Sequence, residues 1–135
     1  MNILKIIRKQ PLSCIEVLAI WVVCMIPIPE TPLDGVAFID KWTHFVMYGT
    51  LVAVIMAEYG HRKSALCWRR LLIGGLLLPI IMGGLVELAQ AYLTNGVRSG
   101  DWYDFAANTV GAAIGAVIGI PLALALSTRN RGAQP

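Results

Sequence analysis

Four long apolar stretches occupy most of this chain, at about residues 11–29, 42–59, 71–93 and 105–126. Each is close to the ~20 residues that an α-helix needs to cross the hydrocarbon core of a bilayer. Charged residues make up only 14% of the 135 residues, whereas soluble domains contain roughly 25%. We therefore predict an all-α membrane protein that forms one domain, residues 1–135, folded as a four-helix transmembrane bundle.

The first apolar stretch also resembles a signal peptide, because Lys5, Arg8 and Lys9 precede it. A secretory signal ends at small residues that form a cleavage site, but this stretch ends in the sequence PIPETP. We therefore expect it to remain in the protein as a membrane helix. A kink is expected in the third stretch at Pro79, because proline lacks a backbone N–H.

Lysine and arginine are unevenly distributed between the two sides of the predicted bundle. Nine of the 11 precede the first stretch, separate the second from the third, or follow the fourth: Lys5, Arg8, Lys9, Arg62, Lys63, Arg69, Arg70, Arg129 and Arg131. The positive-inside rule places such residues in the cytoplasm, so we expect both termini there. Because topology accounts for these charges, they do not indicate nucleic acid as a partner.

Polar residues gather instead at the opposite, extracytoplasmic side of the predicted bundle. They recur at helical spacing where the second stretch begins, where the third ends and where the fourth begins: Asp40, Lys41, His44, Tyr48, Glu87, Gln90, Arg98, Asp101, Asp104 and Asn108. A charged side chain at the centre of a bilayer costs roughly 2.5–3.5 kcal/mol on insertion scales. We therefore expect these residues to face one another in an outward-facing polar pocket, with His44, Arg98 and Lys41 as candidate partners of Glu87.

Some of these residues also have a purely structural interpretation. Asp40 and Asp104 are placed to cap the N-termini of the second and fourth predicted helices. Tyr48 is also typical of the aromatic belt at a membrane interface, and Gln90 of hydrogen bonds between membrane helices. The structural and functional interpretations do not exclude each other.

Glycines recur every four residues in the fourth stretch, at Gly111, Gly115 and Gly119. This spacing leaves one helix face bare, so that another backbone can approach closely, and it predicts either packing within the chain or a homo-oligomer contact. Gly96 and Gly100 lie on either side of Arg98. We expect them to let this loop turn tightly and fold back over the bundle.

Three segments together resemble the VanZ-like family of small membrane proteins: DKWTHF, VELAQ and VRSGDWYDFAANTVG. The family pattern is matched at Asp40, Lys41, His44, Phe45, Glu87, Gln90, Arg98, Asp101, Asp104, Asn108 and Gly111, over about residues 40–119. The resemblance implies a multi-pass protein of the bacterial cytoplasmic (inner) membrane, connected with the cell envelope. The family is named for a member linked to glycopeptide resistance, and membership alone does not assign that phenotype to this chain.

The first hypothesis for function is an enzyme that acts on a membrane lipid or a lipid-linked envelope substrate by acid–base chemistry. Glu87 would serve as acid or base, and His44, oriented by Asp40, as the partner base. The catalytic candidates are Glu87, His44, Asp40 and Asp104. The candidate ligand-binding residues, which include two cations suited to a phosphate or carboxylate, are Arg98, Lys41, Asp101, Asn108, Gln90 and Tyr48.

The second hypothesis is a non-catalytic envelope factor, whose pocket binds a lipid headgroup, a cell-wall precursor, an antibiotic or a partner protein. Transport is a third hypothesis, which the one-sided distribution of the polar residues disfavours. No cofactor is expected. No metal site is assigned, because the outer side holds a single histidine and zinc sites usually combine several Cys and His ligands. Calcium or magnesium bound by Asp101 and Asp104 stays as an alternative.

Overall fold

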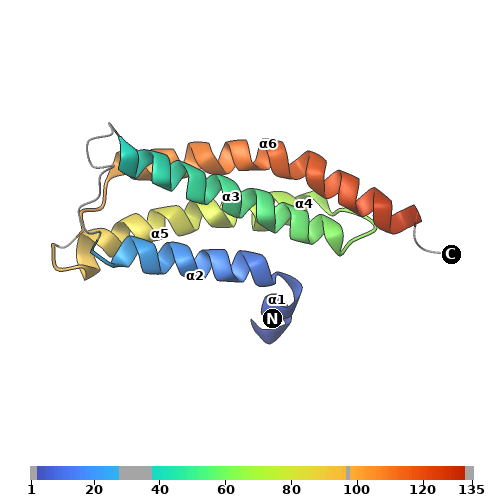
Figure 1. The fold of residues 1–135 in the computed structure, drawn as a ribbon, viewed down its shortest axis with the longest axis horizontal. Helices are drawn as coiled ribbons and strands as arrows, with labels where there is room; N and C mark the ends of the chain where they lie inside the picture. Colours follow the sequence, from blue (N-terminus) through green and yellow to red (C-terminus); the bar gives the residue numbers. More distant parts are fainter. Residues whose placement is uncertain (1–2, 28–37, 97, 133–135) are drawn as a thin grey trace.

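The computed structural model describes residues 3–27, 38–96 and 98–132. Every regular element in these ranges is helical (Figure 1), which confirms the prediction of an all-α protein. The elements in chain order are α1 (Ile3–Lys9), α2 (Pro11–Met25), α3 (Ile39–His61), α4 (Trp68–Leu72), the π-helical turn η1 (Ile73–Leu77), α5 (Leu78–Leu93) and α6 (Trp102–Gly132).

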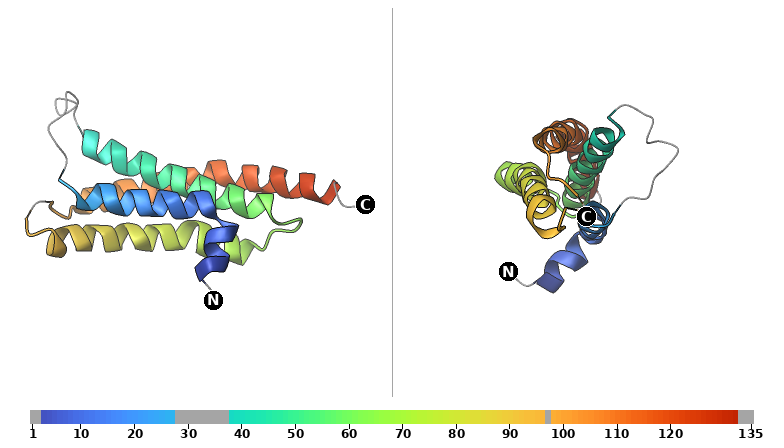
Figure 2. Two further views of the ribbon diagram at one scale, coloured as in Figure 1. Left: turned by 60° about the horizontal axis from the view of Figure 1, so that its bottom comes forward. Right: turned by 90° about the vertical axis from the view of Figure 1, so that its left-hand side faces the viewer.

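Four helical rods lie side by side along the long axis of the molecule: α2, α3, the continuous segment α4–η1–α5, and α6 (Figures 1 and 2). In contrast, α1 turns away from this bundle at its junction with α2 (Figure 2). Gln10 separates the two helices, and Pro11 is the first residue of α2, where its missing N–H would have no helical partner anyway. α3 and α6 begin at the end of the bundle where α2 and α5 finish (Figure 1).

Two of the rods are long and apolar enough to cross a membrane, namely Trp68–Leu93 with 26 residues and Trp102–Gly132 with 31. The helix Pro11–Met25 is apolar but shorter, and the last two residues of the predicted first span, 28–29, lie outside the described residues. α3 has 23 residues, but Asp40, His44 and Glu58 make its sequence less apolar. Length and composition therefore support two of the four predicted spans.

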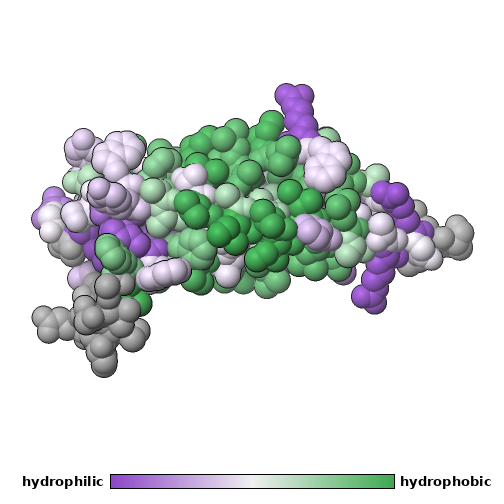
Figure 3. All heavy atoms as spheres, turned by 90° about the horizontal axis from the view of Figure 1, so that it is seen from above, coloured by the Kyte–Doolittle hydropathy of each residue, from purple (hydrophilic) through white to green (hydrophobic). Residues whose placement is uncertain are grey.

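The surface of the bundle is apolar in its middle. On the face drawn in Figure 3, hydrophobic residues cover the central part and hydrophilic residues lie at both ends. Large apolar side chains are exposed on several rods, including Leu18 on α2, Leu85 on α5 and Val117 on α6. Soluble monomers rarely expose contiguous apolar surface on this scale, so the surface is that expected of a membrane protein.

The two ends of the bundle carry opposite charges. We call the acidic end the part formed by the starts of α3 and α6 and the end of α5, where Asp40, Glu87, Asp101 and Asp104 lie. We call the basic end the part formed by α1, the end of α3, α4 and the end of α6. It carries Lys5, Arg8, Lys9, Arg62, Lys63, Arg69, Arg70, Arg129 and Arg131.

α3 and α6 make the closest helix contact in the bundle, and glycines allow it. A Cβ atom at Gly111 would collide with the carbonyl oxygen of Phe45, and one at Gly115 with that of Gly49. Gly119 meets Met56 and the Cα atom of Ala53 in the same way. These glycines therefore pack α6 against α3 of the same chain, which confirms the predicted packing within the chain. A homo-oligomer contact stays a prediction, and α3 already covers the part of this face formed by the three glycines.

The irregularity predicted at Pro79 takes the form of a π-helical turn. This turn, Ile73–Leu77, directly precedes α5, and Pro79 lies in the first turn of α5. Proline cannot donate to the carbonyl four residues earlier and its ring crowds that carbonyl. A wider turn before the proline lets the remaining carbonyls find other donors, which is how membrane helices commonly tolerate proline.

Candidate functional site

The centre of the acidic end is a group of three buried side chains from three helices. The Nδ1 atom of His44 on α3 lies 3.0 Å from Oδ1 of Asn108 on α6 and 3.6 Å from Oε1 of Glu87 on α5. The Nδ2 atom of Asn108 donates to the same Glu87 oxygen at 3.2 Å. All three residues are 8% exposed or less. The helical spacing that placed them at one depth thus corresponds to direct contact.

The loop between α5 and α6 binds the other oxygen of Glu87. The backbone N–H of Asp101 donates to Oε2 of Glu87 at 3.2 Å. This contact requires the loop to lie directly on α5, because a Cβ atom at Gly100 would collide with the carbonyl oxygen of Glu87. The Oγ1 atom of Thr94 accepts the N–H of Arg98 at 3.0 Å and donates to the carbonyl of Gln90 at 2.7 Å. The loop therefore folds back over the bundle, as the glycines predicted.

Lys41 joins the start of α3 to the start of α6. Its Nζ atom lies 2.9 Å from Oδ2 of Asp101 and 2.8 Å from Oδ1 of Asp104. The ammonium group thus lies between the two carboxylates, where a calcium or magnesium ion would have to bind. The pairing with Lys41 therefore disfavours a calcium or magnesium ion held by Asp101 and Asp104.

Asp101, and not Asp104, caps α6. The Oδ1 atom of Asp101 accepts the N–H of Tyr103 at 2.9 Å, the bond that an N-cap side chain makes to the second residue of a helix. This bond, together with the ammonium group of Lys41, holds the pKa of the Asp101 carboxyl below its ordinary value. The cap predicted at Asp40 is also wrong, because the residue before α3 is Phe38, with φ 61° and no side-chain cap.

Arg98 reaches from the loop to the start of α3. Its Nη2 atom lies 3.4 Å from Oδ1 of Asp40, and the same oxygen lies 4.0 Å from Nε2 of His44. Of the three partners expected for Glu87, the described residues place only His44 within 4 Å. Lys41 and Arg98 each pair with other carboxylates, so both predicted ligand-binding cations are already neutralised within the chain.

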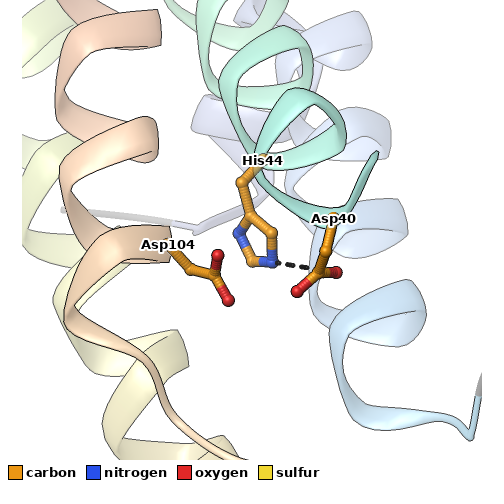
Figure 4. A group of neighbouring side chains, drawn as sticks. All are labelled: Asp40, His44 and Asp104. Carbon is orange, nitrogen blue, oxygen red and sulfur yellow. Dashed lines mark ion pairs between the residues drawn. The ribbon is translucent and has the colours of Figure 1, made fainter. Parts of the chain in front are cut away.

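Figure 4 shows Asp40, His44 and Asp104 facing one another across the starts of α3 and α6. One potential ligand atom from each residue lies within 4.8 Å of the other two. One imidazole and two carboxylates suit several divalent metals, so within the described ranges these three residues are the ones that could hold a metal ion. We had assigned no metal site. The pairing of Asp104 with Lys41 and of Asp40 with Arg98 reduces the negative charge that would attract such an ion.

Gln90 and Tyr48 lie deeper, below the polar centre. The Nε2 atom of Gln90 donates to the backbone carbonyl of Cys24 on α2 at 2.9 Å, which confirms the predicted hydrogen bond between helices. Tyr48 is fully buried, so its assignment to the membrane interface is wrong. The hydroxyl of Tyr48 and the Oε1 atom of Gln90 have no hydrogen-bond partner among the described residues.

An apolar groove reaches the site from the side, between α5 and α6. Its volume is about 390 Å³. Glu87 and Asp101 lie in its lining, together with the apolar side chains of Ile81, Leu85, Leu88, Trp102 and Phe105. A hydrocarbon chain lying in this groove would contact apolar residues along most of its length and the carboxylate of Glu87 at one point.

Sequence comparison identifies the family to which this site belongs. A family model described as VanZ/LLP1 matches residues 3–124 of the chain. The chain belongs to the VanZ/LLP1 family. No curated protein and no solved structure matches this chain. Membership of the VanZ/LLP1 family confirms the resemblance seen in the three polar segments of the sequence.

The hydrogen bonds of this VanZ/LLP1 protein fix the proton on the His44 ring. Asn108 donates its Nδ2 to Glu87, so its Oδ1 is the acceptor that faces His44. The neutral ring must then carry its proton on Nδ1, which leaves the lone pair on Nε2. Nε2 points toward Asp40 (Figure 4). The arrangement therefore provides a nitrogen that can accept a proton, with a buried carboxylate on the other side of the ring.

Three residues that position this VanZ/LLP1 site were missed or underrated in the sequence. A Cβ atom at Gly83 would lie 3.2 Å from the Cβ atom of Asn108, so this glycine makes room for Asn108. Gly83 precedes Glu87 by one helical turn and so lies on the same helix face, and this spacing was the signal in the sequence that could have identified it. Thr94 organises the loop, but nothing in its sequence context distinguishes it from other threonines. Phe38 begins α3 in a left-handed conformation, which its residue type does not predict.

Proposed function

We propose that this VanZ/LLP1 protein is a multi-pass protein of the bacterial cytoplasmic membrane, with four spans and both termini in the cytoplasm. The acidic end would face outward. The positive-inside rule supports this orientation, because nine of the 11 Lys and Arg lie at the basic end. The apolar middle of the bundle, seen in Figure 3, supports its burial in lipid.

In this proposal the acidic end acts on a lipid-linked or cell-envelope substrate by acid–base chemistry. The single observation that carries the proposal is the buried group of His44, Asn108 and Glu87. A buried imidazole whose Nδ1 faces the amide oxygen of Asn108 and the carboxylate of Glu87 is arranged for proton transfer, since the carboxylate stabilises the imidazolium that forms. Packing alone would not require three polar side chains at this depth.

The roles of the residues follow from their places around the ring. Nε2 of His44 would accept the proton of a water molecule that attacks an ester or phosphoester bond of the substrate, and would return this proton to the oxygen that leaves when that bond breaks. Between the two steps, Glu87 would stabilise the imidazolium through Oε1, which lies 3.6 Å from Nδ1. This differs from the sequence-based hypothesis, in which Glu87 itself exchanged the proton. The groove between α5 and α6 would hold an acyl or prenyl chain of the substrate beside Glu87. Asp104 and Asp40 would position the headgroup, with Lys41 and Arg98 as their counter-ions.

The test is lipid turnover by the full chain in proteoliposomes made from a total bacterial envelope lipid extract, followed by mass spectrometry. His44→Gln and Glu87→Gln should each lower turnover by about 100-fold or more, the range that general acid–base groups contribute. His61→Gln is the matched control, because His61 is exposed at the end of α3. Unchanged turnover in the two site variants, with normal thermal stability, would exclude acid–base catalysis here.

The alternative is a non-catalytic factor that binds a headgroup, a precursor or a partner protein. One observation favours this alternative. Lys41 and Arg98 form ion pairs that connect the starts of α3 and α6 with the loop before α6, so the acidic end is already ordered for binding. Envelope lipid that copurifies with the detergent-extracted chain distinguishes the two. A binder would retain the same lipid in Glu87→Gln and show no turnover in any variant.

A further inference from the structure

A cavity lies at the basic end of the protein, away from the candidate site. It has a volume of about 930 Å³ and is bounded by α1, the end of α3 and the segment from α4 to the start of α5. Five cationic side chains line it: Lys5, Lys9, Arg62, Lys63 and Arg70. No carboxylate is among its lining residues. The cavity therefore combines volume with charge of a single sign.

None of the five cations is neutralised within the described part of the chain. The ion pairs found there belong to Lys41, His44 and Arg98, all at the acidic end. Arg62 donates to the backbone carbonyl of Arg8 at 2.9 Å, which positions its guanidinium group without balancing the charge. Five like charges around one cavity repel one another, and an anion that enters the cavity relieves that repulsion.

The acidic residue of this region is already engaged elsewhere. The carboxylate of Glu58 accepts the N–H groups of Leu12 and Ser13 at 3.0 and 3.1 Å and the Ser13 hydroxyl at 2.6 Å. Glu58 thus caps the start of α2 from the neighbouring helix, which satisfies N–H groups that have no helical partner. This cap uses the carboxylate of Glu58, and the described residues place no carboxylate in the lining of the cavity.

The rest of the cavity wall is apolar. Ile6, Ile55, Leu71 and Leu78 line it together with Gly74 of the π-helical turn. A free inorganic anion gains nothing from such a wall, whereas the glycerol backbone and acyl chains of a phospholipid do. α1 turns away from the bundle (Figure 2) and carries Lys5, Arg8 and Lys9, which suits a helix that lies in the plane of the lipid headgroups.

We propose that the basic end holds a site for an anionic phospholipid, whose phosphate binds among Arg62, Lys63 and Arg70 and whose acyl chains lie against Ile55, Leu71 and Leu78. Cationic pockets between membrane helices recognise such headgroups by charge. The site is separate from the polar centre at the acidic end. It does not depend on the function proposed there, and its test leaves that site unchanged.

The first experiment measures lipid bound to the detergent-purified full chain by native mass spectrometry, with added phosphatidylglycerol or phosphatidylcholine. The variant Arg62→Gln, Lys63→Gln, Arg70→Gln should bind phosphatidylglycerol about 100-fold more weakly. The control Arg8→Gln, Arg69→Gln, Arg129→Gln removes the same charge from residues that do not line the cavity, and should change binding less than about 3-fold. Equal losses in both variants would reduce the effect to general surface charge and overturn the site.

The second experiment blocks the cavity without changing any charge. A Cβ atom at Gly74 meets no atom within 4 Å and Gly74 lines the cavity, so Gly74→Leu should add its side chain to the cavity; thermal unfolding checks that the variant is folded. Binding of phosphatidylglycerol should fall about 10-fold or more, while Gly132→Leu, at another open position, should leave it unchanged. Equal binding in both leucine variants would overturn the proposal. Displacement of the lipid by millimolar inorganic phosphate would show a site for a soluble anion instead, and would also overturn it.

Discussion

The two ends of this VanZ/LLP1 bundle use their charges in different ways. At the acidic end, Lys41 and Arg98 pair with carboxylates of the same chain, and a buried polar group lies beneath them. At the basic end, five cations surround a cavity and pair with no carboxylate of the described chain. The cations of the acidic end are therefore neutralised within the chain, whereas those of the basic end have no carboxylate partner among the described residues.

The closeness of backbone packing also differs between the two ends. Around the acidic end, Gly100 and Gly111 bring backbones into direct contact, and a Cβ atom at either position would collide with a carbonyl oxygen. Beside the basic cavity, Gly74 has open space around it. The contact of α3 with α6 stays close as far as Gly60 against Ala123, so the basic end is tightly packed between these two helices and open at the cavity. A preorganised site and an open binding site thus coexist in one small bundle.

The largest effect expected from this difference is at the glycines. Gly111→Ala should destabilise the fold by about 3 kcal/mol or more, because its Cβ atom meets the backbone oxygen of Phe45, which cannot move aside alone. Gly74→Ala should be neutral or slightly stabilising, because alanine is the better helix former and has room here. Thermal unfolding in detergent measures both. Equal stability of the two variants would show that the acidic end is not tightly packed.

A second comparison uses one residue type at the two ends. Asn108→Ala should cost about 1–3 kcal/mol, because it leaves buried polar atoms of Glu87 and His44 without a partner. Asn130 also bridges two helices, donating to the carbonyl of His61 at 2.6 Å. Asn130→Ala should cost under about 1 kcal/mol, because water can replace that exposed bond.

Thermal unfolding of the two asparagine variants, together with wild type, checks this expectation. A cost for Asn130→Ala that matches or exceeds that of Asn108→Ala would contradict it. The buried group at the acidic end would then contribute no more to stability than a surface hydrogen bond, and its preorganisation would have to be explained in another way.

The sequence predicted the polar centre because membrane energetics make such residues stand out. Helical spacing and alternating chain direction were sufficient to place His44, Glu87 and Asn108 at one level. The same reasoning could not say which cation pairs with which carboxylate, since that depends on how the loop through Arg98 and Asp101 folds. The sequence therefore left both Lys41 and Arg98 as candidate partners of Glu87, but among the described residues neither of them forms an ion pair with it.

Other errors have equally local causes. A bare glycine face shows that a backbone approaches but not which one, so α3 and a second copy of the chain were indistinguishable in the sequence. Tyr48 has the composition of an interfacial aromatic, and only the approach of α5 at Gly83 buries it; its Cε1 atom lies 3.3 Å from the Cβ position there. The basic cavity depends on the angle between α1 and α2 and on a π-helical turn, which charge patterns do not predict.

The smallest expected effect tests the electrostatics of the acidic end through Asp101. Its pKa is held down first by the N–H of Tyr103 and then by Lys41. A carboxyl group whose pKa is lower in the folded state stabilises the fold above its unfolded pKa, and this contribution is lost as the pH falls through the folded value.

The Tyr103 amide signal, followed by NMR, should therefore titrate with a midpoint below that of an ordinary aspartate. Lys41→Met should raise the midpoint only in part, because the Tyr103 bond is the larger cause; a full return to the ordinary value would assign the effect to Lys41 alone. The lysines and arginines of the basic end should keep their charge over the same acidic range, because these groups stay protonated.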